Sequence, residues 1–134
     1  MHSMESEYLG ELRSTNQHLK SGQKVITDAP TDNNGKGEAF SPTDLVCSAL
    51  SACMMTIMGI VARRENVDLT GMTSKITKEM SANPRKIAKI TVEFEKNGLE
   101  ASDKQKEMLK NAALTCPVAL SLDPAIEQKV SFSF

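Results

Sequence analysis

The amino-acid sequence predicts an α+β fold, and three observations support this class. A long apolar helix is expected from Pro42 to about Glu65. Segments that alternate apolar and polar residues, as half-buried strands do, lie on both sides of that helix. The expected order is strands, a helix, strands, a second helix and a final strand, which is an α+β arrangement. The length suits a single domain, residues 1–134, in which residues 1–7 form a disordered tail.

The segment before the long helix is expected to form irregular strands from Tyr8 to Asp28. A turn signal at Ser21-Gly22 precedes a clearer strand at residues 24–27. Residues 29–37 are rich in Gly, Asn and Asp, which is typical of a loop.

The start of the long helix carries clear signals. Ser41 is a good N-cap, Pro42 suits the first helical position, and Asp44 completes a capping box. Residues 45–62 are uncharged and just long enough to span a membrane, but they contain serine and threonine and lack flanking aromatic residues. We therefore expect a buried central helix and no membrane partner. Its apolar stripe at i, i+4 spacing consists of Leu45, Ala49, Cys53 and Ile57.

The second half of the chain predicts a hairpin, a helix and a last strand. Two alternating segments joined by a turn form the hairpin, with one face buried. The second helix starts near Ser102, has Cys116 on its apolar side and ends at Pro117. The expected strands are residues 75–80, 90–95 and 130–134.

The composition argues against a nucleic-acid partner. The formal net charge is -1, so no basic surplus is available to neutralise phosphates. Aromatic residues make up only 4% and tryptophan is absent, so stacking platforms for bases are not expected. The N-terminus lacks the apolar segment of a secretory signal, and we therefore expect a cytoplasmic location.

The three cysteines are the candidate chemical groups. An odd count in a cytosolic protein argues against a disulfide framework and favours reactive thiols. No pair has C-x-x-C spacing, and we expect no metal. Cys53 is the main candidate nucleophile, but it needs a cationic partner because burial alone raises the pKa of a thiol. Plain packing stays open for Cys53 and Cys116, and it is the expected role of Cys47, about 240° from Cys53 around the helix.

Two cysteine motifs and two N-terminal segments point to a known family. The motifs are Phe40-Ser41-Pro42-Thr43-Asp44-Leu45 with Ala49-Leu50-Ser51-Ala52-Cys53, and Cys116-Pro117-Val118 with Ser121-Leu122. Together with residues 8–13 and 35–40, they resemble the OsmC/Ohr family of thiol peroxidases. The resemblance covers roughly Tyr8 to Phe134.

The resemblance implies both a fold and an activity. The implied fold has antiparallel sheets around long central helices that carry the cysteines, in an intertwined homodimer. The implied activity is a thiol-dependent peroxidase that reduces organic hydroperoxides, and hydrogen peroxide less efficiently, without a metal or organic cofactor. A dithiol, for example of the lipoyl type, would be the reductant.

The resemblance also implies the roles of three residues. Cys53 is the peroxidatic thiol, Cys116 is the resolving thiol with which it forms a disulfide, and Arg13 stabilises the thiolate. A guanidinium stays charged at all relevant pH and favours ionised sulfur. Peroxide converts the thiolate to a sulfenic acid, which condenses with a neighbouring thiol.

The sequence departs from the family at two positions. In the best-characterised branch a Glu stands at the position of Thr43 and pairs with the arginine. Here Asp44 is adjacent but is expected to point elsewhere on the helix, and Glu38 in the preceding loop is the candidate for this pairing. Ala119 stands where relatives often carry a larger polar residue.

Two other functions stay open on the same fold. One is a homodimeric small-molecule binding or scaffold protein that retains its thiols and has little peroxidase turnover. The other is thiol chemistry on a different electrophile. Peroxide consumption with a dithiol donor separates the peroxidase from the binding protein.

Overall fold

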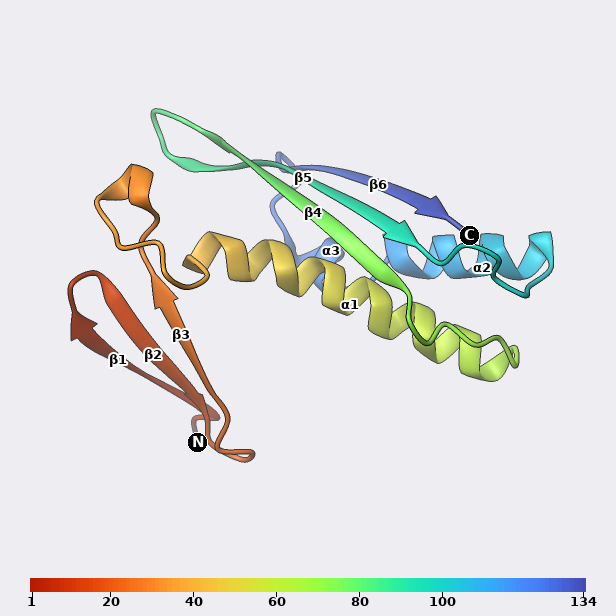
Figure 1. Cartoon of the computed structure of the whole chain (residues 1–134), viewed down its shortest axis with the longest axis horizontal. Coiled ribbons are helices and arrows are strands. Elements are labelled where there is room, and N and C mark those ends of the chain that lie inside the picture. Colours follow the sequence, from red (N-terminus) through yellow and green to blue (C-terminus); the bar gives the residue numbers. More distant parts are fainter. The chain divides into compact units, whose positions relative to one another are not determined.

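The computed structural model describes residues 1–134 and confirms the α+β class. The chain divides into two compact units, residues 1–46 and residues 47–134. Each unit contains its own three-stranded sheet, β1-β2-β3 in the first and β4-β5-β6 in the second (Figure 1).

The sheet of the first unit is an antiparallel meander. Its strands are β1 (Met4–Gly10), β2 (Arg13–His18) and β3 (Lys24–Asp28), and a short 3-10 helix, η1 (Thr31–Asn33), follows. Residues 4–7 were expected to belong to a disordered tail, but they pair with β2 and form most of β1. The expectation rested on their polarity, and it failed because the strand is held by backbone hydrogen bonds that polar residues make equally well.

The long helix, α1 (Pro42–Arg64), begins as the sequence predicted. The Asp44 N–H donates to Ser41 Oγ, and the Ser41 N–H donates to Asp44 Oδ2, both at 3.0 Å. This reciprocal pair is a capping box with aspartate in place of the usual glutamate. It satisfies N–H groups at the helix start that have no partner within the helix.

The sheet of the second unit combines antiparallel and parallel pairing. The predicted hairpin is confirmed, because β4 (Thr73–Ser81) and β5 (Lys86–Glu95) pair antiparallel. The last strand, β6 (Glu127–Ser133), pairs parallel with β5, so the expectation of purely antiparallel sheets is wrong. A crossover through α2 (Asp103–Leu114) and α3 (Pro117–Ser121) makes this possible, because parallel neighbours need a long connection.

The core of the second unit lies between its sheet and its helices. Figure 1 shows α1 and α2 on the same face of β4-β5-β6. Ile90, Val92 and Phe94, which alternate along β5, are buried in this core, as the pattern predicted. Phe94 stacks on Phe132 of β6 with ring centroids 5.5 Å apart. The largest fully buried apolar side chains are Phe94, Leu50, Met54, Met58, Ile90, Leu109 and Val92.

Helix α1 is apolar enough to cross a membrane by length and composition. Its most apolar window has a mean hydropathy of 2.1, and 39% of that window is buried inside the chain. The core helix of a soluble protein has the same length and composition, so this property by itself does not favour a membrane span.

Candidate active site

Cys53 lies near the middle of α1, and its side chain is half-buried. It packs against the core of the second unit without being part of its buried centre. The apolar stripe that the sequence predicted is only partly covered, since Leu45, Cys53 and Ile57 are half-buried and Ala49 is exposed. The buried stripe is rotated around the helix and consists of Cys47, Leu50, Ser51, Met54, Met58, Val61 and Ala62. Cys53 therefore stays accessible at the margin of the core.

Cys47 has the packing role that its helical position predicted. Its side chain is 2% exposed and belongs to the core cluster. The difference in burial between Cys47 and Cys53 follows from their angular separation on one helix.

Cys116 lies in the bend between α2 and α3, and its side chain is fully buried. The sequence placed it in a second helix ended by Pro117. Instead, α2 ends at Leu114, Cys116 is the N-cap of α3, and Pro117 begins that helix. Proline suits a first helical position because its missing N–H would have no partner there. The Cys116 Sγ accepts a hydrogen bond of 3.4 Å from the Ala119 N–H.

Gln128 of β6 fixes the turn that holds this sulfur. The Nε2 of Gln128 donates to the carbonyl oxygen of Ala119 at 3.1 Å. The N–H of Ala119 in turn donates to the Sγ of Cys116. Ala119 therefore helps to hold the sulfur of Cys116 through its backbone N–H and carbonyl groups, and this role does not depend on its side chain. Gln128 was missed at the sequence level, because its side chain acts across the crossover between α3 and β6.

The structure brings Cys53 and Cys116 together from α1 and from the bend after α2. Burial raises the pKa of the Cys116 thiol, and a side-chain hydrogen bond with Cys53 raises it further, while the N–H groups of Ala119 and Val118 act in the opposite direction. All three cysteines are free thiols. Cys116 is consequently a protonated, enclosed thiol at neutral pH, held next to a thiol that solvent can reach.

Arg13 lies at the start of β2 in the first unit, directly opposite Asp28 of β3. Its Nε donates to Asp28 Oδ1 at 2.7 Å and its Nη2 to Asp28 Oδ2 at 2.8 Å. The side chain of Asp28 is 1% exposed, and that of Arg13 is 29% exposed. The hydrogen bond from Arg13 holds the pKa of Asp28 below its ordinary value, and Asp28 in turn raises the pKa of Arg13. The pair is a bidentate ion pair, the strong form of this contact.

Glu38 is the second carboxylate of this cluster. Its Oε1 accepts from Arg13 Nη2 at 3.2 Å, and its side chain is 64% exposed. Glu38 was the loop candidate for pairing with the arginine, whereas the principal partner, Asp28, was missed. The available signal was the turn at Ser21-Gly22, because a hairpin centred near it places Asp28 opposite Arg13.

Thr43 and Asp44 take part in the start of α1. Asp44 forms the capping box, and Thr43 Oγ1 lies 3.1 Å from Ser41 Oγ at hydrogen-bonding distance. These contacts give both residues a place in the cap of the helix that carries Cys53.

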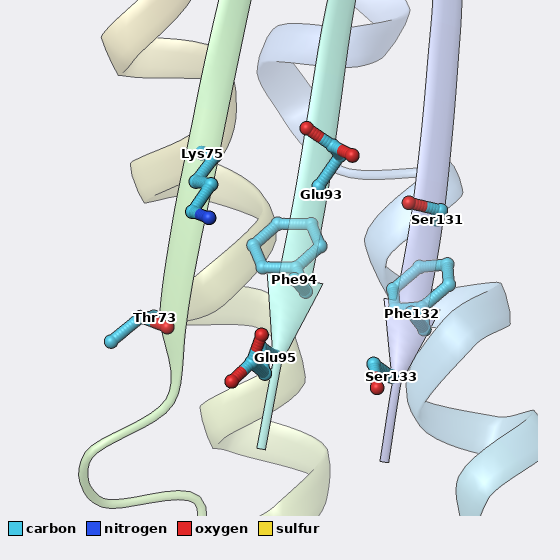
Figure 2. Close-up of a pocket in the computed structure, with 8 residues that line it drawn as sticks. All are labelled: Thr73, Lys75, Glu93, Phe94, Glu95, Ser131, Phe132 and Ser133. Atoms are coloured by element: carbon cyan, nitrogen blue, oxygen red, sulfur yellow. The ribbon is translucent and has the colours of Figure 1, made fainter. Parts of the chain in front are cut away.

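A polar hollow of roughly 350 Å³ lies over the strand ends of the second sheet. Figure 2 shows Lys75, Glu93 and Glu95 around it, with Phe94 on β5 and Phe132 on β6. None of the predicted site residues lines this hollow. The thiol pair, and not this hollow, is therefore the candidate active site.

Comparison with known proteins settles the family. The model of the OsmC-like protein family matches residues 35–131. The chain belongs to the OsmC-like family. A candidate osmotic stress induced and detoxification response protein from Psychrobacter arcticus 273-4 is 47% identical, with a TM-score of 0.94 over 98% of this chain and 96% of that one. The predicted family and the α+β, OsmC-like fold are thus confirmed.

More distant solved structures share the OsmC-like fold. The organic hydroperoxide resistance protein OsmC from Legionella pneumophila is 18% identical, with a TM-score of 0.72 over 100% of this chain and 98% of that one. An organic hydroperoxide resistance protein from Elizabethkingia anophelis is 15% identical, with a TM-score of 0.72 over 99% of this chain and 96% of that one. No curated protein matches the sequence.

Proposed function

We propose that this OsmC-like protein is a thiol-dependent peroxidase that reduces organic hydroperoxides, and hydrogen peroxide less efficiently. The observation that carries the proposal is the pairing of half-exposed Cys53 with buried Cys116. An accessible thiol can meet a peroxide, and a second thiol held beside it can condense with the product. Two structural neighbours named for organic hydroperoxide resistance support the same class of substrate.

The proposed reaction has two steps on the protein. The Cys53 thiolate attacks the terminal oxygen of the hydroperoxide, so that an S–O bond forms, the O–O bond breaks and the alkoxide leaves, which takes up a proton from solvent to give the alcohol. The sulfur of Cys116 then attacks the sulfenic sulfur of Cys53, which releases water and forms the disulfide. An external dithiol, for example of the lipoyl type, restores both thiols by exchange and is itself oxidised to a disulfide.

Arg13 is assigned the role of stabilising the Cys53 thiolate. The guanidinium keeps its charge at all relevant pH and favours ionised sulfur. Glu38 supports the site through its bond to Arg13, and Thr43 and Asp44 support it by capping the helix that carries Cys53. Replacing Arg13 with alanine is expected to slow alkylation of Cys53 at neutral pH.

We also propose that the protein is a homodimer in the cytoplasm. Ile60 on α1 is 52% exposed, and large apolar side chains are exposed throughout the first unit. Surfaces of this kind are typical of obligate interfaces, and a second copy would cover them in the intertwined arrangement that the family implies. A stable, active monomer in sedimentation at micromolar concentration would contradict the dimer. The exposed large apolar residues of the first unit are Met1, Met4, Tyr8, Leu9, Leu12, Leu19, Val25, Ile26, Phe40 and Val46.

Peroxide consumption with a dithiol donor tests the proposed function. Cys53→Ser should abolish consumption of an organic hydroperoxide, and the matched variant Cys47→Ser should retain it, because Cys47 lies in the core. Undiminished turnover by Cys53→Ser would end the proposal. If the unaltered protein binds the hydroperoxide but does not consume it, the alternative function as a small-molecule binding protein is favoured over the peroxidase.

The fate of the thiols tests the two-step reaction. After one equivalent of hydroperoxide, non-reducing peptide mapping should find a cross-link between Cys53 and Cys116. A stable sulfenic acid on Cys53 with Cys116 still free would show a one-cysteine cycle, in which an external thiol reduces Cys53 directly.

A further inference from the structure

The short helix that follows Cys116 depends on support from the rest of its unit. Helix α3 has five residues, Pro117–Ser121, and none of them is buried. A helix of little more than one turn is marginal by itself, because few backbone hydrogen bonds offset the cost of starting it. Bonds within α3, such as the 2.7 Å bond from Ser121 Oγ to the carbonyl oxygen of Pro117, do not attach it to the sheet.

Gln128 attaches α3 to the sheet. It lies on the half-buried side of β6, in a row with Val130 and Phe132, at a position that suits an apolar side chain. A polar side chain that is withdrawn from water there costs free energy unless it is hydrogen-bonded. The bond from Gln128 Nε2 to the carbonyl oxygen of Ala119 meets this need and ties α3 to β6.

The strand gives Gln128 a firm base. Gln128 lies in register with Ile90 of β5, which is fully buried. The residue before it, Glu127, forms an ion pair of 3.0 Å with Lys89 of the same neighbouring strand. Two hydrogen bonds therefore lead from a fixed strand to the sulfur of Cys116, one to the carbonyl group of Ala119 and one from its N–H group.

We propose that Gln128 is a positioning residue for disulfide formation, which keeps the sulfur of Cys116 aligned with the sulfenic sulfur of Cys53. This inference rests on the second step of the proposed function. In that step an S–S bond forms, the S–O bond of Cys53 breaks, and the leaving hydroxide takes up the proton of the Cys116 thiol to give water. A disulfide forms only in a narrow range of geometries, so alignment of the attacking sulfur controls the rate.

A sulfenic acid on Cys53 has two fates, and their ratio measures the alignment of Cys116. It condenses with Cys116, or it reacts with dimedone, a reagent that traps sulfenic acids. The reduced protein is treated with one equivalent of cumene hydroperoxide in the presence of dimedone. Non-reducing peptide mapping then gives the ratio of dimedone adduct to disulfide.

Gln128→Leu should raise this ratio by about fivefold, the factor that corresponds to the net contribution of one hydrogen bond. Gln128→Glu has nearly the same shape, but its carboxylate cannot donate to a carbonyl oxygen, so it should have the same effect at neutral pH. It keeps the inference testable if Gln128→Leu does not fold. An unchanged ratio in a folded Gln128 variant would overturn the inference.

Ser121→Ala is the matched control. It removes a hydrogen bond within α3 and leaves the link to β6 in place, so the ratio should not change. An equal rise in Ser121→Ala would show that any loosening of α3 has this effect, and the inference would fail.

The pH dependence of Gln128→Glu separates hydrogen-bond donation from a general loss of stability. A protonated carboxyl group donates a hydrogen bond, as the amide does. The ratio in Gln128→Glu should therefore return toward that of the unaltered protein as the pH falls to the ordinary carboxyl pKa of about 4.3. Gln128→Leu should stay high over the same range. Equal ratios in the two variants at pH 4 would overturn the inference.

Diamide, which oxidises pairs of thiols to disulfides without a peroxide, separates this inference from the proposed function. If the hydroperoxide oxidises neither cysteine, the proposed function fails, while slower cross-linking by diamide in Gln128→Leu still supports the positioning of Cys116. If Gln128→Leu and the unaltered protein form the cross-link equally fast with both oxidants, the inference fails and the proposed function stands.

Discussion

Ser51 of α1 and Ser74 of β4 share a hydrogen bond of 2.7 Å between their hydroxyl groups. Ser51 is 3% exposed and lies two positions before Cys53 on the same helix. The bond ties this part of α1 to the sheet at a fixed rotation. That rotation turns Cys47 into the core and leaves Cys53 at its margin.

Removing the Ser51 hydroxyl should therefore destabilise the protein. Ser51→Ala leaves the hydroxyl of Ser74 without its partner, and we expect a loss of about 1–2 kcal/mol in the free energy of unfolding. Urea denaturation measures it. Ser48→Ala, the same substitution one turn earlier on α1, is the matched control, and an equal loss in both variants would contradict a role for the bond.

The Cys116 thiol should react only at alkaline pH. Burial and the Cys53 side chain raise its pKa, so it stays protonated at neutral pH, and its enclosed sulfur should label more slowly there than the half-exposed sulfur of Cys53. Iodoacetamide labelling read by mass spectrometry over a pH series checks this order. Labelling of Cys116 before Cys53 at neutral pH would contradict it.

Cys53→Ser should move the labelling curve of Cys116 to lower pH. The variant removes the interactions with the Cys53 thiol that raise the pKa of Cys116, while burial remains. The curve should still lie above that of an ordinary exposed thiol. An unchanged curve would mean that burial alone sets the reactivity of Cys116.

Gln128→Leu should loosen the turn that holds the sulfur of Cys116. The side-chain bond to Ala119 is lost, and we expect the free energy of unfolding to fall by about 1 kcal/mol. The Ala119 N–H lowers the pKa of Cys116, so a less well fixed turn should move Cys116 labelling to higher pH. Lys129→Leu, on the exposed face of β6, is the control, and a shift of equal size there would argue against the Gln128 contact.

The ion pair between Arg13 and Asp28 should make stability depend on pH in acid. Because the folded pKa of Asp28 is lowered, the pair stabilises the protein fully above the unfolded carboxyl pKa of about 3.9. This contribution is lost as the pH falls through the folded pKa. The difference in urea midpoint between the unaltered protein and Asp28→Asn should therefore be large at pH 6 and shrink toward pH 2. Glu7→Gln in the exposed part of β1 is the control.

The elements that depend on local patterns were predictable from the sequence. The cap at Ser41, the long helix and the alternation in β5 are each specified within a few residues, and each is confirmed. The face of α1 that packs against the sheet could not be predicted, because an apolar helix does not mark which of its faces meets the sheet. The predicted stripe with Cys53 lies beside the buried residues of the helix.

The features that were missed depend on contacts far apart in the chain. Asp28 became visible as the partner of Arg13 only through the register of β2 and β3. The parallel pairing of β6 depends on the whole crossover after β5. Cys116 was predicted at the end of the second helix, but it is the N-cap of α3. The sequence could not decide between the two, because a proline such as Pro117 can follow the end of one helix or begin the next.

The parallel pairing of β6 with β5 has a consequence for the order in which the protein folds. Strands β4 and β5 are neighbours in the chain and can pair early, whereas β6 must wait until the segment with α2 and α3 has closed on the sheet. Cys116 lies within that late segment, and its turn is tied to β6 by Gln128. A folding chain therefore passes through a stage in which Cys53 has no Cys116 thiol beside it. If the two thiols react as proposed, oxidant that meets the chain at that stage would convert Cys53 to acids that thiols do not reduce, and newly made molecules should be more easily inactivated than mature ones.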